Sequence, residues 1–235
     1  MNPFRLVPAA LPPRAFASVR AALFVLALLP FARLVLLGVQ ERLGANPVEF
    51  VLRSLGTWTL VLLLATLAVT PLRWMTGWAW LVRLRRMLGL YAFFYAALHV
   101  VAYVWIDHYF DWPSIVADIV KRPYLTFGFG AFVLMLPLAA TSTNAMVRRL
   151  GGRNWQRLHR LVYAIGVLGV LHYWYHKLAK NDLAEPAVYA LVLGVLLGMR
   201  VLRWLAERTG RMSPRQDSRD SPANSRAAVS RSRTR

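Results

Sequence analysis

Long apolar stretches separated by short polar segments run through most of the chain. Each stretch holds about 20 mostly apolar residues, the length that an α-helix needs to cross the hydrocarbon core of a bilayer. Hydrophobic residues make up 57% of the 235 residues, more than a water-soluble domain of this size needs. The pattern therefore predicts an all-α, polytopic membrane protein, a bundle of about six transmembrane helices. The predicted spans are 16–38, 49–70, 84–106, 124–142, 155–176 and 185–206.

The charges between these spans differ on the two sides of the predicted bundle. The chain has 29 Lys and Arg residues against 10 Asp and Glu residues. Six spans put both termini on one side, where the segments before the last span hold 12 Lys and Arg residues, against 6 on the opposite side. Loops rich in Lys and Arg stay in the cytoplasm. We therefore expect both termini to be cytoplasmic, in a multi-pass protein of the bacterial inner membrane, and we expect no nucleic-acid site.

The composition divides the chain into three predicted parts. Residues 1–15 form a cytoplasmic N-terminal segment, 16–207 form the transmembrane domain, and 208–235 form a basic tail with almost no large apolar side chain. A tail of this composition cannot bury enough apolar surface to fold, so we expect it to be disordered. Its arginines either contact anionic lipid headgroups or are simply solvated.

The ionisable residues inside the predicted spans narrow the possible chemistry. The chain has no cysteine, which excludes disulfides, thiolate metal sites, iron–sulfur clusters and covalently attached c-type haem. His99 in the third span and His172 in the fifth both fall in the outer half of the bilayer. Two histidines at one depth on different helices can clamp a haem iron from both faces, and neutral imidazole brings no charge into the membrane. Such ligation leaves no open position on the iron, which favours electron transfer over oxygen chemistry.

His159 lies nearer the cytoplasmic end of the predicted fifth span. Arg85, at a similar depth, shares a face of the third span with His99, because 14 residues of helix return to within about 40°. A second haem at this inner level would have His159 as its protein ligand and Arg85 near a propionate or the open axial position. Against this, the 13-residue step from His159 to His172 is about 220° of rotation, which points the two rings apart on a straight helix. For each histidine the alternative is a core side chain hydrogen-bonded to a neighbouring helix.

Three runs of sequence resemble the ferric-reductase-like transmembrane domain, and more narrowly the haem-binding subunits of periplasmic methionine-sulfoxide reductase systems. The runs are NPVEFVLRSLGTWTLVLLLATLAVTPLR (46–73), RLRRMLGLYAFFYAALHVVAYVWID (83–107) and NWQRLHRLVYAIGVLGVLHYWY (154–175), and the resemblance covers about 15–206. It implies one or two b-type haems, with His99, His159 and His172 as ligands of the haem iron and with Arg85 and Arg86 as the basic inner motif of the cofactor site. It also implies FMN as a cofactor, to which no residue is assigned.

The same resemblance implies an electron conduit that has no substrate chemistry of its own. Electrons would come from the quinone pool or a cytoplasmic flavin reductase and pass through haem to a periplasmic molybdopterin methionine-sulfoxide reductase, which repairs oxidised periplasmic proteins. Within the wider superfamily, eukaryotic ferric reductases and NADPH oxidases carry a second histidine on the third span, where this chain has Arg85, and a large flavin and nicotinamide module after the spans. Here no glycine-rich nucleotide motif opens a helix after a strand. We therefore expect the electrons to arrive from another molecule.

Two other functions remain open at this point. A self-contained quinol-dependent reductase would need an open haem position at the outer surface, which the pairing of His99 with His172 disfavours. A haem-free proton or ion transporter would use the histidines and Arg33 as its path, and would be colourless. Arg33 itself either snorkels to the interface or neutralises a haem propionate. The predicted partner surface is the longest outer loop, 107–123, with Tyr109, Phe110, Asp111 and Trp112.

Overall fold

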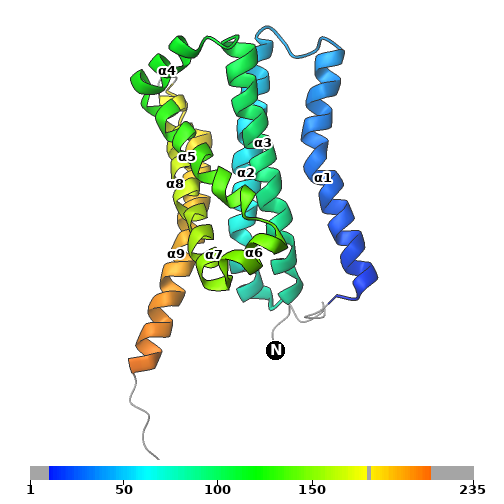
Figure 1. Cartoon of the computed structure of the whole chain (residues 1–235), viewed down its shortest axis with the longest axis vertical. Coiled ribbons are helices and arrows are strands. Elements are labelled where there is room, and N and C mark those ends of the chain that lie inside the picture. The colour runs from blue at the N-terminus through cyan, green and yellow to red at the C-terminus, as the bar shows by residue number, and fades with distance from the viewer. Residues whose placement is uncertain (1–10, 179–180, 213–235) are drawn as a thin grey trace, which may run out of the picture. The chain divides into compact units, whose positions relative to one another are not determined.

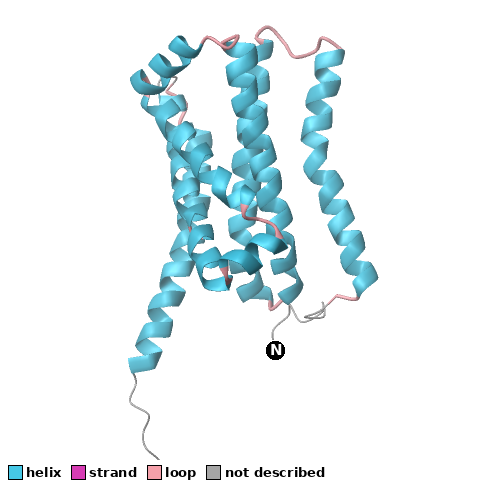
Figure 2. Ribbon diagram, viewed as in Figure 1, coloured by secondary structure: helices cyan, strands magenta, loops and turns pink. Residues whose placement is uncertain are grey.

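The computed structural model describes residues 11–178 and 181–212, and every regular element within them is helical (Figures 1 and 2). The chain divides into two compact units, residues 1–198 and 199–235. Most of the predicted segment 1–15 and the part of the predicted tail beyond Met212 lie outside the described residues. The remaining part of that tail, 208–212, continues the last helix.

Five helices in the described part of the chain are long and apolar enough to cross a membrane. They are α1 (Pro13–Val39), α2 (Pro47–Thr76), the continuous run Ala79–Asp107 and α5 (Pro123–Ala140), together with residues 184–209 of α9 (Ala184–Met212). The run Ala79–Asp107 joins a 3₁₀ turn η1 (Ala79–Leu84), α3 (Arg85–Ala102) and a π-helical turn η2 (Tyr103–Asp107). The remaining helices are α4 (Trp112–Lys121), α6 (Asn144–Leu150), α7 (Gly152–His159) and α8 (Leu161–Leu178). The prediction of an all-α, multi-pass membrane protein is confirmed.

The predicted fifth span, 155–176, is wrong at its start. This segment forms two helices, α7 and α8, which meet at Arg160. The helix α8 has 18 residues, but its last turns carry His172, His176 and Lys177, which lower its apolar character. His159 ends α7 and His172 lies on α8. The rotation of about 220° that one straight helix would put between the two rings therefore does not apply. The two short helices α6 and α7 lie at the lower end of the bundle in Figure 1.

The helix α2 has the most buried apolar stretch of the five long helices. It packs along α3 and also contacts α1 and α8, while α5 packs along α8. Leu67 on α2 is completely buried, and Gly166 on α8 faces it, since a Cβ built on Gly166 would lie 3.3 Å from Leu67 Cδ1. The four helices α2, α3, α5 and α8 therefore form the packed scaffold on which the candidate site is built.

Local sequence explains where several helices begin and end. Asn46 caps α2 by accepting a hydrogen bond from the backbone N–H of Glu49, and Pro47 occupies the first turn. The helix ends at Gly77, whose φ of 76° is a left-handed conformation that glycine adopts without strain. Asp111 caps α4 in the same way as Asn46 caps α2, through the N–H of Ser114. These caps determine where α2 begins and ends and where α4 begins.

A buried lysine ties the end of α8 to the start of α9. Lys177 is only 4% exposed, donates a hydrogen bond to Asp182 and lies 3.5 Å from Glu185. The Tyr173 hydroxyl donates to the same Glu185. The hydrogen bond from Lys177 holds the pKa of the Asp182 carboxyl below its usual value. Two carboxylates thus compensate one buried cation at this end of α8.

Within the unit 199–235, the described residues complete α9. The Arg203 Nε lies 3.2 Å from a carboxylate oxygen of Glu207, one turn further along the helix. The guanidinium of Arg208 lies 3.8 Å from the ring centre of Trp204. Such exposed pairs along one helix contribute little to stability, about 0.3–0.5 kcal/mol for the ion pair.

The hydroxyl of Tyr95 is inserted into the hydrogen-bond ladder of α1. It accepts a hydrogen bond from the backbone N–H of Phe31 at 3.1 Å and donates one to the carbonyl of Ala27 at 2.7 Å. These two backbone groups are four residues apart and would pair directly in a regular helix. The insertion lies next to Pro30, which interrupts the ladder because it has no N–H. Tyr95 therefore anchors α1 to α3 next to Pro30.

We expect Tyr95→Phe to destabilise the fold by about 1–3 kcal/mol, because two backbone groups of α1 lose their buried partner. Reversible unfolding in mixed detergent micelles would measure the free energy. Tyr91→Phe is the matched control, since its hydroxyl makes one longer hydrogen bond, 3.3 Å to the carbonyl of Phe24. Equal stability of the wild type and Tyr95→Phe would contradict the anchoring role.

Candidate functional site

The structure places His99 and His172 next to each other, although they belong to two different helices. His99 lies on α3 and His172 on α8, and their ring centres are 6.2 Å apart with the ring planes at 82°. Both side chains are partly buried inside the bundle. Counting residues from the ends of the predicted spans put the two histidines at one depth, and the structure has them as direct neighbours.

Each imidazole is fixed by a hydrogen bond to a helix carbonyl. The Nδ1 of His99 lies 3.0 Å from the carbonyl of Leu52 on α2, and the Nδ1 of His172 lies 2.7 Å from the carbonyl of Tyr124 on α5. A carbonyl only accepts, so both Nδ1 atoms carry the hydrogen in the neutral tautomer. The two Nε2 atoms are then unprotonated, and neither has a hydrogen-bond partner among the described residues. This is the tautomer that a metal-binding histidine needs.

A glycine follows each of these carbonyls four residues later. Gly56 follows Leu52 on α2, and Gly128 follows Tyr124 on α5. In an α-helix the Cβ of a residue points back over the preceding turn, so a side chain at either glycine would cover the carbonyl that the histidine uses. Both glycines therefore open a helix surface to an imidazole ring. The sequence analysis did not identify these two glycines. In both helices the glycine lies four residues after the residue whose carbonyl binds the histidine.

The contact at Gly128 is the tighter of the two. A Cβ built on Gly128 would lie 2.6 Å from Nδ1, 2.9 Å from Cε1 and 3.1 Å from Cγ of His172. A Cβ on Gly56 would lie 3.3 Å from Cε1 and 3.5 Å from Nδ1 of His99. The His172 ring thus lies directly on the backbone of α5, whereas the His99 ring leaves slightly more room against α2.

The distances suit a haem iron held between the two rings. A bond from a metal ion to a histidine nitrogen is about 2.0 Å long and that nitrogen lies ~1.1 Å from the ring centre, so two imidazoles on one iron have ring centres roughly 6 Å apart. The observed separation of 6.2 Å agrees with this spacing. The separation of the two rings, each with its Nδ1 already hydrogen-bonded, therefore fits His99 and His172 as the residues that would hold one haem iron.

His159 lies apart from this pair, at the end of α7. Its ring stacks on Trp155 with ring centres 3.8 Å apart, and its Nδ1 lies 3.1 Å from the Trp155 carbonyl. Its Nε2 is buried and has no hydrogen bond to a described residue, although the Leu138 carbonyl lies nearby. The indole N–H of Trp155 donates to the carbonyl of Thr141, which fixes the stack against the end of α5. One buried nitrogen is thus left without a partner at this second position.

The two predicted arginines have different surroundings. Arg85 is partly buried at the start of α3, within electrostatic range of the His159 ring. Arg86 is exposed, and its Nη1 donates a 2.7 Å hydrogen bond to the side chain of Asn144, which joins α3 to α6. Only Arg85 lies near the predicted inner ligand, while Arg86 links two helices.

The chain is similar to known proteins over most of its length. The sequence profile of the family described as "Ferric reductase like transmembrane component" matches residues 55–170. A protein of Ralstonia nicotianae named protein-methionine-sulfoxide reductase heme-binding subunit MsrQ is 62% identical over 206 residues, which cover 87% of this chain and 95% of the relative. The protein of the same name from Bordetella pertussis is 57% identical over 83% of this chain and 94% of the relative. No solved structure matches the chain.

The matched region contains the elements that carry the candidate site. Residues 55–170 run from α2 through α8, and include Gly56, His99, Gly128 and His159, while His172 lies just beyond them and within the longer similarity to the relatives named above. An identity above half across nearly the whole chain exceeds what a shared fold alone would require. This chain therefore belongs to the family of MsrQ proteins, the haem-binding subunits of protein-methionine-sulfoxide reductases.

Proposed function

We propose that this chain is a membrane subunit that holds haem and carries electrons across the bilayer to a methionine-sulfoxide reductase. The observation that supports this most is the pair of His99 and His172, in which carbonyls hold both Nδ1–H groups and leave both Nε2 atoms for an iron. The names of the relatives agree with the same function. When bound there, haem would supply reversible one-electron chemistry between ferric and ferrous iron.

The protein's own contribution is to hold two neutral ligands in one orientation. The hydrogen bonds to Leu52 and Tyr124 select the tautomer with a free Nε2 and fix the orientation of each ring. Neutral imidazoles also avoid the cost of an unpaired charge inside the membrane. If His99 and His172 both bind the haem iron, they would leave no position on it for a small substrate. This arrangement supports electron transfer and disfavours a self-contained reductase.

A second haem is part of the proposal. His159 would be its protein ligand, because its buried Nε2 has no hydrogen bond to a described residue, and Arg85 would lie near a propionate or the open axial position. Arg86 belongs to the same basic motif but is already bound to Asn144, so we assign it to the wall of this site and not to the iron. The family resemblance also implies FMN, for which we propose no residues of this chain.

The direction of electron flow follows from the charges of the loops. With the Lys- and Arg-rich segments in the cytoplasm of a bacterial inner membrane, the His99 and His172 pair lies toward the periplasm and His159 toward the cytoplasm. Electrons would enter at the cytoplasmic side from the quinone pool or a flavin reductase and leave at the periplasmic side. Their acceptor would be a periplasmic molybdopterin methionine-sulfoxide reductase, so the catalytic chemistry belongs to the partner.

The loop 107–123 is the proposed surface for that partner. It contains the amphipathic helix α4, whose Ile115 is buried against the protein. Three aromatic side chains at its start remain exposed: Tyr109 at 80%, Phe110 at 52% and Trp112 at 59%. Asp111 between them is used as the cap of α4. Exposed aromatic residues of this kind are typical anchors of protein interfaces.

The proposal is tested first by the colour of the purified protein. Reduced-minus-oxidised absorption spectra of the detergent-solubilised chain should show a b-type haem, and a pyridine-haemochrome assay should give one or two haems per chain. His159→Ala should remove the inner haem alone and leave the signal of the His99 and His172 pair, because the two positions share no ligand. A colourless protein prepared with ample haem would overturn the proposal and favour the ion-transport alternative.

A further inference from the structure

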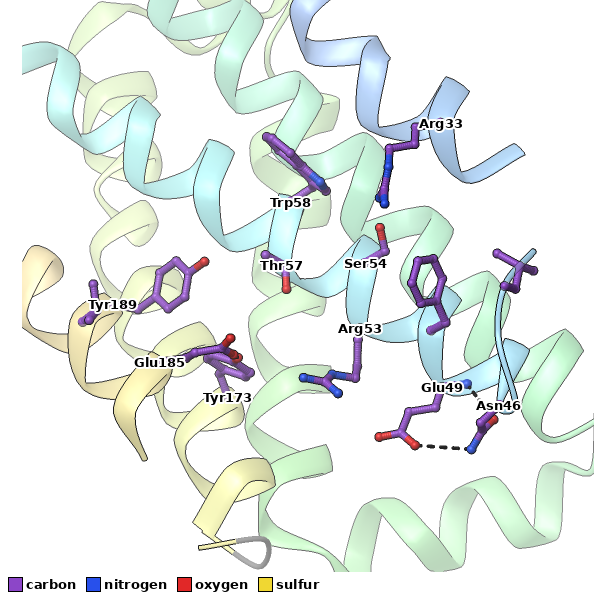
Figure 3. A pocket seen from close by; sticks show the side chains of 13 residues that line it. Arg33, Asn46, Glu49, Arg53, Ser54, Thr57, Trp58, Tyr173, Glu185 and Tyr189 are labelled. Carbon is purple, nitrogen blue, oxygen red and sulfur yellow. Dashed lines mark hydrogen bonds between the residues drawn. The ribbon is translucent and has the colours of Figure 1, made fainter. Parts of the chain in front are cut away.

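A cavity of about 790 Å³ opens between α1, α2, α8 and the start of α9. Figure 3 shows Arg33 reaching into it from α1 and Arg53 from α2, with Trp58, Tyr173 and Tyr189 on its walls. The cavity exists because α1 packs loosely, with only Phe16, Ala27 and Leu34 of its side chains buried. Neither histidine of the central pair lines it.

Both arginine side chains are exposed, and Arg53 lies within longer electrostatic range of Asp182. Neither guanidinium makes a hydrogen bond or an ion pair with a described residue. The two carboxylates of the cavity have other partners, because Glu49 accepts from the Asn46 side chain and Glu185 accepts from Tyr173 and lies beside Lys177. Arginines in a membrane protein normally pair with an anion or a carbonyl, since an unpaired charge there is costly. The unpaired guanidinium groups therefore indicate an external anion.

The depth of the two arginines identifies the source of that anion. Arg33 lies six residues before the end of α1 and Arg53 six residues after the start of α2, so each is about 9 Å from its helix end. The 30 residues of α2 span about 45 Å, close to the full bilayer with its headgroups, and the hydrocarbon core takes about 30 Å of that. Both arginines thus lie at the boundary where the phosphates of lipids are found.

We propose that the phosphate of a membrane phospholipid binds between Arg33 and Arg53. The planar guanidinium suits phosphate because it donates two parallel hydrogen bonds. The aromatic rings along the cavity would contact the glycerol and the first part of the acyl chains. Phosphatidylethanolamine, whose headgroup carries one phosphate, is the probe of choice. This site is separate from the haem ligands and does not depend on them.

The test measures lipid retention in the purified chain. After delipidation in detergent, phosphatidylethanolamine should give a one-lipid adduct in native mass spectrometry and raise the melting temperature. Diacylglycerol with the same acyl chains and inorganic phosphate should do neither. The double variant Arg33→Gln/Arg53→Gln should retain the lipid about tenfold less, since two charge-assisted contacts are lost. Arg42→Gln, a change in the loop at the same end of the bundle and outside the cavity, should behave as wild type.

Three results would overturn the proposal. An unchanged adduct in the double variant would show that the arginines do not hold the lipid. An equal response to inorganic phosphate would assign the site to a free anion. Loss of haem from the double variant with full lipid retention would assign the arginines to a haem carboxylate. Arg33→Lys/Arg53→Lys keeps the charges if the glutamine variant fails to fold, and should weaken retention because lysine lacks the planar fork.

Discussion

Alanine in place of His172 should remove the haem that the α3 and α8 pair would hold, and His99→Ala should do the same. In the proposed site both rings would bind the same iron, and one remaining imidazole would not be enough to hold the haem. The expected result is loss of that haem's whole signal from the reduced-minus-oxidised spectrum, with the pyridine-haemochrome content of each variant reduced by one haem per chain. His159→Ala would leave this signal in place.

The matched control for this prediction is another histidine of α8. His176 lies one turn beyond His172, and its ring is 5.3 Å from the ring of Tyr124, so it shares much of the same surroundings. We expect His176→Ala to keep the full haem content. Full haem in either His99→Ala or His172→Ala would show that the two rings are not joint ligands. A loss in His176→Ala as well would point instead to a general failure of α8.

The shared depth of His99 and His172 could be predicted because it depends only on helix geometry. A transmembrane helix rises by a fixed distance per residue, so residue counts from the span ends give the depth of each side chain. The rotation of one helix against another is not fixed in this way. Whether two side chains at one depth face each other is decided by packing, here of α2 against α3 and of α5 against α8.

The break between α7 and α8 could not be predicted for a related reason. The sequence has no proline or glycine close to Arg160, and the run LHRLVY is typical of a continuous helix. The chain turns there because Trp155 and His159 pack together at the end of the bundle, with the Trp155 N–H bound to the carbonyl of Thr141. Tertiary contacts thus override local propensity. The same holds for the hydrogen bond between the Tyr95 hydroxyl and the backbone N–H of Phe31, because the two residues are 64 positions apart in the sequence.

Gly128→Ala should weaken haem retention by about 10- to 100-fold, the usual effect of disturbing the group that orients a metal-binding histidine. The new Cβ would lie 2.6 Å from Nδ1 of His172 and 2.9 Å from Cε1, too close for either atom to remain where it is. The atoms it meets belong to a rigid ring, so the ring must leave the Tyr124 carbonyl or α5 must move away from α8. Haem content after dialysis against a haem-binding protein would measure the effect.

Gly130→Ala separates this effect from a general change in α5. It is on the same helix and has the same gain in helix propensity, but its Cβ would be 4.0 Å from Leu168, an ordinary contact. Gly56→Ala should fall between the two, since its Cβ meets the His99 ring at 3.3 Å and a small shift relieves it. The expected order of haem loss is therefore Gly128→Ala, then Gly56→Ala, then Gly130→Ala. If Gly128→Ala kept as much haem as Gly130→Ala, the carbonyl opened by the glycine would not be what orients His172.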